Sequence, residues 1–109
     1  MPEILGSFEQ AVLVSIVNLG DAAYGRSILR EIEARLGRQV VAGAVYATLD
    51  RLEAKGLTSS RLGAGTPERR GRPRRFYSLQ PDGVRALNQA RRATERIWSG
   101  VRWPLKGRG

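Results

Sequence analysis

The sequence predicts an α+β fold, mainly helical, with three helices, a two-stranded hairpin and a longer fourth helix. Apolar residues recur at helical spacing in four segments. A Thr- and Ser-rich stretch and an aromatic stretch lie on either side of a run of Gly, Pro and Arg, which is typical of two strands and their connecting loop. The 109 residues suffice for one domain around a single core.

The first helix is predicted over residues 8–19. Its apolar residues follow one another at spacings of four, four and three: Phe8, Val12, Ile16 and Leu19. Ser7, with Gln10 three residues later, resembles a capping box, in which two side chains satisfy free N–H groups of the first turn. We therefore expect the helix to start next to Ser7 and to end at Gly20.

The second helix is predicted over residues 24–36. It ends at Gly37, because glycine readily adopts the left-handed conformation that closes a helix. Gly25, inside the first turn, lowers helix stability unless another group packs closely against it. Residues 39–42 are short and β-branched, so we expect a small strand or a bridge there.

The third helix is predicted from Gly43 to Gly56, and its two faces differ. Val45, Leu49 and Leu52 fall at i, i+4 and i+7, which predicts one buried stripe. On a helical wheel the opposite side is small and polar, with one arginine. This side carries Gly43, Ala44, Ala47, Arg51 and Ala54, with Thr48 and Lys55 beside them.

The slim side of the third helix fits the major groove of B-DNA, which admits one helix and from which bulky side chains would hold it away. Arg51 can then reach a guanine edge or a phosphate, and Thr48 can offer a hydroxyl or a methyl group. The alternative is a solvated side of good helix formers without a partner. The place of this helix, third in the series and directly before a basic hairpin, favours DNA.

The hairpin is predicted as two antiparallel strands, over residues 57–62 and 75–79, joined by a basic loop. From Arg61 to Arg75 there are six arginines and one acidic residue, Glu68, a net charge of +5. Arginine binds phosphate through two parallel hydrogen bonds. A solvated loop is the alternative, but mutual repulsion of the charges favours contact with phosphates or the minor groove. The candidate contacts are Arg69, Arg70, Arg72, Arg74 and Arg75.

The fourth helix is predicted to start with Pro81 at its first position and to reach Val101. Its apolar stripe lies beyond the compact unit and would favour aggregation if it stayed exposed, so we expect a homodimer rather than packing within the chain. The predicted interface contains Phe8, Val84, Leu87, Thr94, Ile97, Trp98 and Val101.

Three helices followed by a β-hairpin make a winged helix-turn-helix, in which the hairpin is the wing. We assign residues 1–80 to this DNA-binding domain, residues 81–101 to a C-terminal dimerisation helix, and residues 102–109 to a flexible tail.

Composition supports a polyanionic partner and excludes several classes of enzyme. The chain has 19 Lys and Arg against 10 Asp and Glu, a net charge of +9, and such a surplus attracts nucleic acid. It has no His and no Cys, which removes Ser-His-Asp and Cys-His catalysis, disulfides and the usual zinc or iron sites. The carboxylates show no paired spacing, and no phosphate-binding Gly-Lys-Ser/Thr loop occurs. We expect no enzymatic activity, no metal and no other cofactor.

The N-terminus does not have the charged start and apolar run of a signal peptide. No apolar segment approaches the ~20 residues that a membrane span needs. We therefore expect a cytoplasmic protein without a membrane partner.

Two phrases, "GAVYATLDRLEAKGL" at residues 43–57 and "GRPRRFYSLQPDGVRAL" at residues 71–87, resemble the PadR family of bacterial transcription regulators. The segment "AYGRSILREIE" is similar to the second helix of that family, which opens with a Gly-Tyr or Tyr-Gly pair. The resemblance spans about residues 5–87. It implies a dimeric winged-helix repressor that dimerises through a C-terminal helix.

The resemblance also implies roles for single residues. Gly43, Ala44, Tyr46, Thr48 and Arg51 match the recognition helix of the family, and Arg72 and Arg74 match the basic residues of its wing. Tyr46 matches a motif tyrosine that can contact the DNA backbone, and Tyr77 matches a strand tyrosine that anchors the core.

Three departures from the family pattern stand out. Ala44 replaces the usual Thr, Gln80 replaces the Thr that caps the last helix, and a single helix follows the wing. The chain is therefore of the short type, which puts a large dedicated ligand domain in doubt. Some PadR-like dimers bind flat aromatic compounds between their terminal helices, and Trp98 can stack on such an effector. Packing in the dimer core is the favoured alternative for this residue.

Together these observations predict a sequence-specific regulator of transcription that binds double-stranded DNA as a homodimer, with a repressor acting on a two-fold-symmetric operator as the expected form. A winged-helix protein–protein adaptor is the rival interpretation, but it does not need a loop with five arginines. RNA binding is a third option, although the aromatic sheet surface that single strands require is missing.

Overall fold

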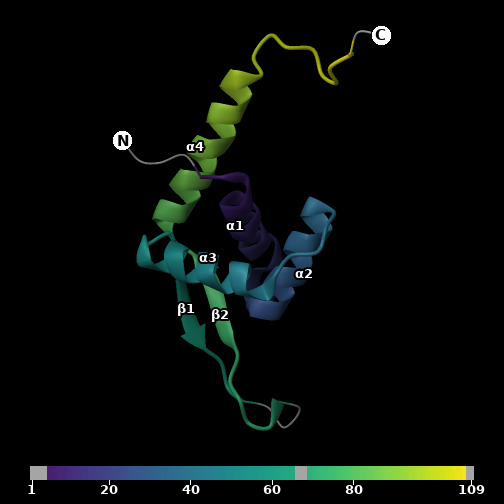
Figure 1. The fold of residues 1–109 in the computed structure, drawn as a ribbon. Helices are drawn as coiled ribbons and strands as arrows, with labels where there is room; N and C mark the ends of the chain where they lie inside the picture. Colours follow the sequence, from purple (N-terminus) through teal and green to yellow (C-terminus); the bar gives the residue numbers. More distant parts are fainter. Residues whose placement is uncertain (1–4, 66–68, 108–109) are drawn as a thin grey trace.

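The structure is a computed structural model that describes residues 5–65 and 69–107. Glu68, the acidic residue of the basic loop, lies outside the described residues. The predicted order of elements is confirmed (Figure 1). The elements are α1 (Ser7–Leu19), α2 (Gly25–Leu36), α3 (Ala42–Ala54), β1 (Thr58–Leu62), β2 (Arg75–Leu79) and α4 (Pro81–Ile97), with a short 3₁₀ turn (Gly20–Ala22) after α1.

Helix α1 lies at the centre of the fold, because it contacts α2, α3, α4 and β2 (Figure 1). Each neighbouring element contributes apolar side chains to one core. The fully or almost fully buried residues include Val12, Leu13 and Ile16 of α1, Ile28 and Ile32 of α2, Val45, Leu49 and Leu52 of α3, and Tyr77 of β2. The buried stripe predicted for the third helix is therefore confirmed.

The start of α1 differs from the prediction. The capping residue is Gly6, and Glu9 Oε1 accepts a hydrogen bond of 3.3 Å from its backbone N–H. Gln10 instead donates through Nε2 to the carbonyl oxygen of Leu5, at 2.8 Å. The capping box predicted for Ser7 and Gln10 is wrong by one residue, because Ser7 is already helical and Glu9 takes the acidic position three residues after the cap.

The α2–α3 connection contains no strand. The backbone N–H of Val40 donates to Glu33 Oε2 at 2.9 Å, and α3 begins two residues later, at Ala42. The strand or bridge predicted over residues 39–42 is therefore wrong, because a side-chain carboxylate satisfies this backbone instead of a second strand. The end of α2 is as predicted, with Gly37 in the left-handed conformation at φ 67°.

The wing is an antiparallel pair of strands attached to the start of α2. Thr58 pairs with Leu79 at one end of the ladder, and Leu62 pairs with Arg75 at the other. The backbone N–H of Tyr77 donates to the carbonyl oxygen of Ala23 at 2.8 Å, and Tyr24 forms an isolated bridge with Phe76. These contacts fix the position of the wing relative to α2.

Helix α4 begins at Pro81, as predicted, and packs closely on the hairpin. A Cβ atom on buried Gly83 would overlap the carbonyl group of Leu57, so this position requires glycine. The helix ends at Ile97, four residues before the predicted end at Val101. The chain turns at residues 98–100, where Gly100 has φ 77°.

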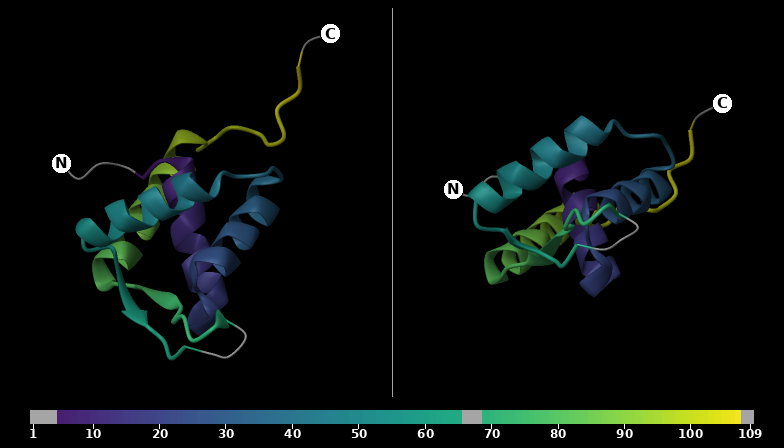
Figure 2. Two further views of the ribbon diagram at one scale, coloured as in Figure 1. Left: turned by 60° about the horizontal axis from the view of Figure 1, so that its bottom comes forward. Right: turned by 90° about the horizontal axis from the view of Figure 1, so that it is seen from below.

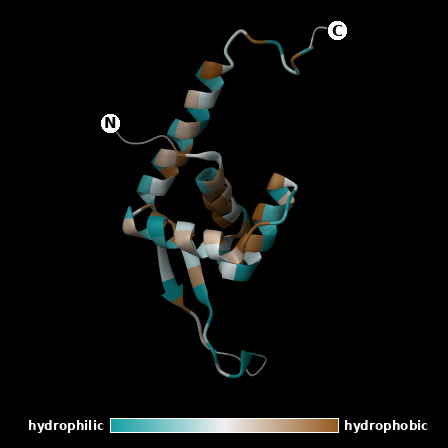
Figure 3. Ribbon diagram, viewed as in Figure 1, coloured by the Kyte–Doolittle hydropathy of each residue, from teal (hydrophilic) through white to brown (hydrophobic). Residues whose placement is uncertain are grey.

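The molecule is elongated, with extents of 58 × 35 × 21 Å. The C-terminal part of α4 and the tip of the wing project in opposite directions from the helical body (Figures 1 and 2). Hydrophobic residues concentrate on α1 at the centre, whereas the coloured part of the wing that leads back into β2 is hydrophilic (Figure 3). Among the described residues, no helix has the length and apolar character to cross a membrane.

Candidate nucleic-acid interface

The outer side of α3 carries the small residues that the sequence analysis assigned to it. Gly43, Ala44, Ala47, Arg51 and Ala54 are all exposed. A Cβ atom on Gly43 would meet no other group within 4 Å, so this side of the helix is open. We call these five residues the α3 face. Their contact with DNA stays a prediction.

Thr48 is the exception on α3. Its exposed fraction is only 3%, so the prediction that it stands exposed beside Arg51 is wrong. Thr48 lies three residues after Val45 and four before Leu52, and those two residues belong to the buried stripe. Its Oγ1 atom accepts a hydrogen bond of 3.3 Å from Arg51 Nη2, so Thr48 helps to orient the arginine.

Arg51 and Lys55 both lie near a carboxylate of the central helix. Glu9 Oε2 is 3.6 Å from Lys55 Nζ and 4.0 Å from Arg51 Nη2. The side chain of Glu9 is 18% exposed, whereas those of Arg51 and Lys55 are 54% and 42% exposed. The principal cation of the α3 face is therefore close to an acidic partner in the free protein.

A hollow of about 430 Å³ lies beside the α3 face. Ala44, Ala47 and Arg51 line it together with Phe8 and Arg38, among others. Phe8 is partly buried against the core and lines this hollow, and its place in a dimer interface stays a prediction. Arg38 is not among the predicted contacts; its place in the loop directly before α3 was the available signal.

The arginines of the wing have few partners. Arg69 Nε donates to the Arg72 carbonyl oxygen at 3.2 Å, and the Arg72 backbone N–H donates to the Arg69 carbonyl oxygen at 3.1 Å. Arg75 Nη1 donates to Ser60 Oγ at 3.0 Å. Arg70 is exposed and has a positive φ of 55°. Over residues 5–65 and 69–107, no ion pair joins a wing arginine to a carboxylate.

Aromatic rings hold two of the basic side chains at the base of the wing. The guanidinium of Arg74 lies 4.2 Å from the ring centroid of Tyr24, and that of Arg61 lies 5.1 Å from the ring centroid of Phe76. The two rings meet edge to face, with their centroids 5.8 Å apart. Arg74 Nε is buried without a hydrogen-bond partner. Arg74 is therefore the most restrained of the candidate contacts in the wing.

A pocket of about 300 Å³ joins the start of α2, the start of α3 and the base of the wing. Its lining includes four arginines and no carboxylate: Arg26, Arg69, Arg74 and Arg75. Tyr46, half exposed, also lines it and lies against Gly25, where an added Cβ atom would be 2.5 Å from the Tyr46 hydroxyl. The close packing that the sequence analysis required for Gly25 is present. Arg26 was missed, because a single arginine at a helix start carries no distinctive pattern.

Tyr77 lies at the inner edge of the same pocket but belongs to the core. Only 6% of the residue is exposed. Burial, and secondarily the negative charge of Asp50, raises the pKa of the Tyr77 phenol above its ordinary value. The side chain therefore stays neutral, which agrees with the anchoring role that the resemblance implied.

Helix α4 and the turn after it expose apolar surface. Val84, in the first turn of the helix, is 46% exposed, and Ile97 and Val101, at and beyond its end, are 75% and 45% exposed. Trp98, 39% exposed, meets Trp103 edge to face with the ring centroids 5.4 Å apart. Both rings line a hollow of about 810 Å³. Thr94, another of the predicted interface residues, is exposed and lines the same hollow.

Leu87 behaves differently from the rest of the predicted dimer stripe. It is partly buried and packs against the core of its own chain, as does Ala86, while Ala90 is 1% exposed. One side of the first half of α4 therefore packs within the chain. Val84 stays exposed on this half, and the other exposed apolar residues of the predicted stripe lie at and beyond the end of the helix.

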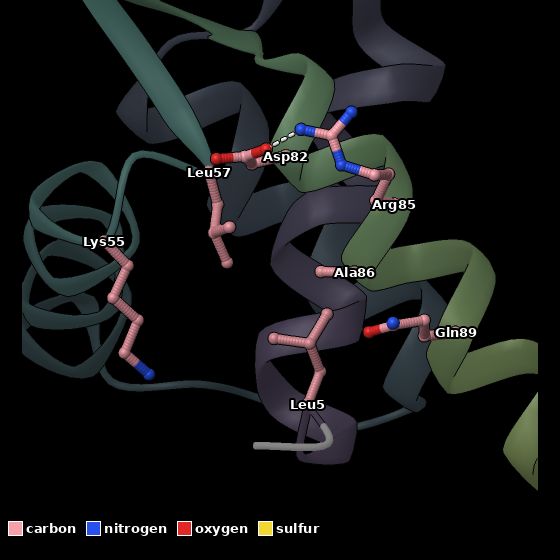
Figure 4. A pocket seen from close by; sticks show the side chains of 7 residues that line it. All are labelled: Leu5, Lys55, Leu57, Asp82, Arg85, Ala86 and Gln89. Atoms are coloured by element: carbon pink, nitrogen blue, oxygen red, sulfur yellow. Dashed lines mark hydrogen bonds and ion pairs between the residues drawn. The ribbon is translucent and has the colours of Figure 1, made fainter. Parts of the chain in front are cut away.

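A further pocket, of about 560 Å³, lies between the starts of α1, β1 and α4 (Figure 4). Lys55 reaches toward it from α3, and Asp82 accepts a hydrogen bond from Arg85 on its opposite side. Since both signs of charge line this pocket, it is less suited to a polyanion than the pocket at the base of the wing. The described part of the chain holds no group of three or more acidic side chains that could bind a metal ion.

Comparison with known proteins identifies the family to which the chain is related. The model of the transcriptional regulator PadR-like family matches residues 12–89. The transcriptional regulator Rv3488 of Mycobacterium tuberculosis is 40% identical over 77 residues, which are 68% of this chain and 64% of that relative. The match therefore spans slightly less than two thirds of the length of that protein.

Solved structures agree with this fold. A PadR family transcriptional regulator from Eggerthella lenta has a TM-score of 0.65 and 27% identity, over 83% of this chain and 76% of that one. A PadR-like regulator from Bacillus cereus has a TM-score of 0.71 over 92% of each chain, and at 21% identity it supports the fold alone. The winged helix, the two phrases that span α3 and the wing, and the family match over most of the chain lead to one conclusion. The chain belongs to the PadR-like family of transcriptional regulators.

Proposed function

We propose that this regulator binds double-stranded DNA as a homodimer, with sequence preference, and acts in the cytoplasm as a repressor on a two-fold-symmetric operator. Residues 1–80 form the DNA-binding unit, and α4 with the turn after it forms the dimer contact. Two copies of α3 then enter successive major grooves about 34 Å apart, and the wings bind the adjacent backbone or minor groove.

One observation carries the proposal: a slim, open helix face lies next to a wing whose arginines have no acidic partner among the described residues. The pocket between α2, α3 and the wing lies where Ala42 and Tyr46 of α3 approach the wing, and its four arginines suit a phosphate. The α3 face suits a groove because none of its residues except Arg51 is bulky.

The residues of the DNA contact divide into two groups with separate roles. Gly43, Ala44, Ala47 and Arg51 read the groove, whereas Tyr46 and the arginines of the wing bind the backbone. Thr48 acts indirectly, since its hydroxyl holds Arg51. Lys55, at the end of α3, adds charge next to the groove.

The exposed end of α4 supports the dimer. Ile97 and Val101 would stay in water in a monomer, and pairing with a second copy covers them. We propose that Trp98 packs in this interface. A flat aromatic effector would use the same hollow, and quenching of tryptophan fluorescence by a planar dye tests for it.

Selection of binding sites from random duplex DNA tests the proposed function. We expect enrichment of a two-fold-symmetric motif whose half-sites are one helical turn apart. Sedimentation should show a dimer for the wild-type protein and a monomer for Ile97→Asp. If no sequence is enriched and duplex affinity is no greater than the net charge produces, the proposal is wrong, and the winged-helix adaptor becomes the better interpretation.

A further inference from the structure

We infer that Glu9 determines specificity: it holds Arg51 and Lys55 away from phosphates, so that α3 engages fully only on the correct DNA sequence. The inference rests on the proposed function. Glu9 belongs to α1 and to none of the surfaces that contact DNA in that proposal. It therefore acts through Arg51 and Lys55 as a positioning residue.

The carboxylate of Glu9 is itself fixed in place. Its Oε1 atom accepts a hydrogen bond from the Gly6 backbone N–H, which closes the first turn of α1. Its Oε2 atom then faces α3, near Lys55 and Arg51. At 18% exposure the side chain has little freedom to turn toward solvent. Glu9 is thus a fixed negative charge beside the most exposed cation of the α3 face.

Arg51 is held in a folded-back position. Its Nη2 atom donates to Thr48 Oγ1, one turn earlier on the same helix, and lies 4.0 Å from Glu9 Oε2. To reach a base edge beyond the α3 face, the guanidinium must leave both partners. The separation from Glu9 is at the outer limit of an ion pair, and such partly exposed pairs are weak. A good bidentate acceptor, such as the edge of a guanine, can therefore replace Glu9.

The same pairing reduces attraction to unrelated DNA. Contacts between cations and phosphates supply almost all non-specific affinity, and each one adds about 0.9 to the slope of log K against log salt concentration. While Arg51 and Lys55 stay near Glu9, neither adds a phosphate contact. The wing then supplies the non-specific affinity, and α3 adds to it only where Arg51 finds a base edge.

The test uses Glu9→Gln in the full chain. The amide oxygen of glutamine can still accept from the Gly6 N–H, so the cap of α1 is kept while the negative charge is removed. Glu53→Gln is the matched control. Glu53 is exposed on α3, no ion pair joins it to the described residues, and its replacement changes the net charge by the same amount.

The two DNA probes are the most enriched duplex from the random selection and a scrambled duplex of the same length and composition. For Glu9→Gln we expect the affinity for the scrambled duplex to rise by about two- to tenfold, the range that one or two exposed ion pairs provide. Its salt slope should steepen by up to about 0.9 per added phosphate contact. Affinity for the enriched duplex should rise less, so the ratio of the two affinities falls. Glu53→Gln should leave the ratio unchanged.

Three results would overturn the inference. The first is a ratio for Glu9→Gln that matches the control, and the second is a loss of affinity for both duplexes, which would indicate a purely structural role. The third is an equal fall in the ratio when Glu9→Gln is made in a background that carries both Arg51→Ala and Lys55→Ala, because the effect would then depend on neither cation. A wild-type protein that does not distinguish the two duplexes would instead show that the proposed function itself is wrong.

Discussion

The α3 face and the wing differ in how their charges are held. On α3 the principal cation, Arg51, has a hydroxyl and a carboxylate near its guanidinium. In the wing, the described arginine side chains interact with a carbonyl oxygen, a serine hydroxyl and two aromatic rings, and form no ion pair with a described carboxylate. The positive charge of the α3 face is therefore partly neutralised before any ligand binds, whereas that of the described part of the wing is not.

The difference separates affinity from selectivity. Unpaired arginines attract any polyanion, because counterion release does not depend on base sequence. A cation that must leave an internal partner gains only where the new partner is better. In the proposed function, the wing therefore holds the duplex and α3 decides which duplex is held. Substitutions on each surface test this division.

The largest effect is expected from loss of charge in the wing. Arg72→Ala together with Arg74→Ala should weaken binding to all duplexes by roughly ten- to a hundredfold at moderate salt, because two phosphate contacts disappear. The salt slope should fall by about 1.8 in total. A salt titration with the enriched and the scrambled duplex measures both quantities. An unchanged slope would contradict the role of the wing.

Arg51→Ala should affect the α3 face, and therefore selectivity rather than general affinity. We expect a loss of about 1–3 kcal/mol on the enriched duplex, as for one bidentate base contact, and almost no loss on the scrambled one. A repeated selection with the variant should give a motif with one relaxed position in each half-site. Equal losses on both duplexes would place Arg51 with the phosphate contacts.

Gly25→Ala tests the junction between the two surfaces. The added methyl group collides with the ring of Tyr46, so the ring must move and the fold should lose about 1 kcal/mol of stability. Gly43→Ala is the control for stability, since open space surrounds that position and alanine favours the helix. Thermal unfolding should therefore shift in opposite directions for the two variants. A stabilised Gly25→Ala protein would show that Tyr46 adapts freely.

The smallest effect is expected where Arg74 lies over Tyr24. Tyr24→Leu removes a cation–π contact and an edge-to-face ring pair, which together are worth about 1 kcal/mol at a partly exposed site. The base of the wing should loosen while α3 stays intact. Hydrogen exchange should then rise at residues 75–79 and stay constant in α3.

The third helix shows how far sequence alone could go. The buried stripe followed from spacing, because Val45, Leu49 and Leu52 are strongly apolar and leave one orientation. Thr48 lies on the flank of that stripe, and its burial depends on the elements that pack against α3, which are α1, α2 and β1. A threonine at the edge of an apolar stripe can be either buried or exposed, so only the packing of a neighbouring element decides whether it is buried.

Other misses have a different origin. The end of α4 was predictable, since Ser99 and Gly100 offer the usual stop signal, but the apolar stripe that reaches Val101 obscured it. By contrast, the bridge between Tyr24 and Phe76 joins residues far apart in the chain. The place of Glu9 beside Arg51 and Lys55 likewise needs the crossing of α1 and α3, which no local pattern encodes.

The long axis of the molecule has a mechanical consequence. Gly83 and Ala90 have almost no side chain, so α4 packs closely on the helical body at these two positions. The helix and the body should therefore rotate together about a pivot near Ile97. The lever arm from that pivot to the far end is only part of the 58 Å extent, yet a tilt of several degrees still displaces the far end by a few ångströms, comparable with the rise of about 3.4 Å between stacked base pairs. In the proposed dimer, a small change in packing between the two subunits would therefore move the two copies of α3 out of register with the successive grooves of DNA.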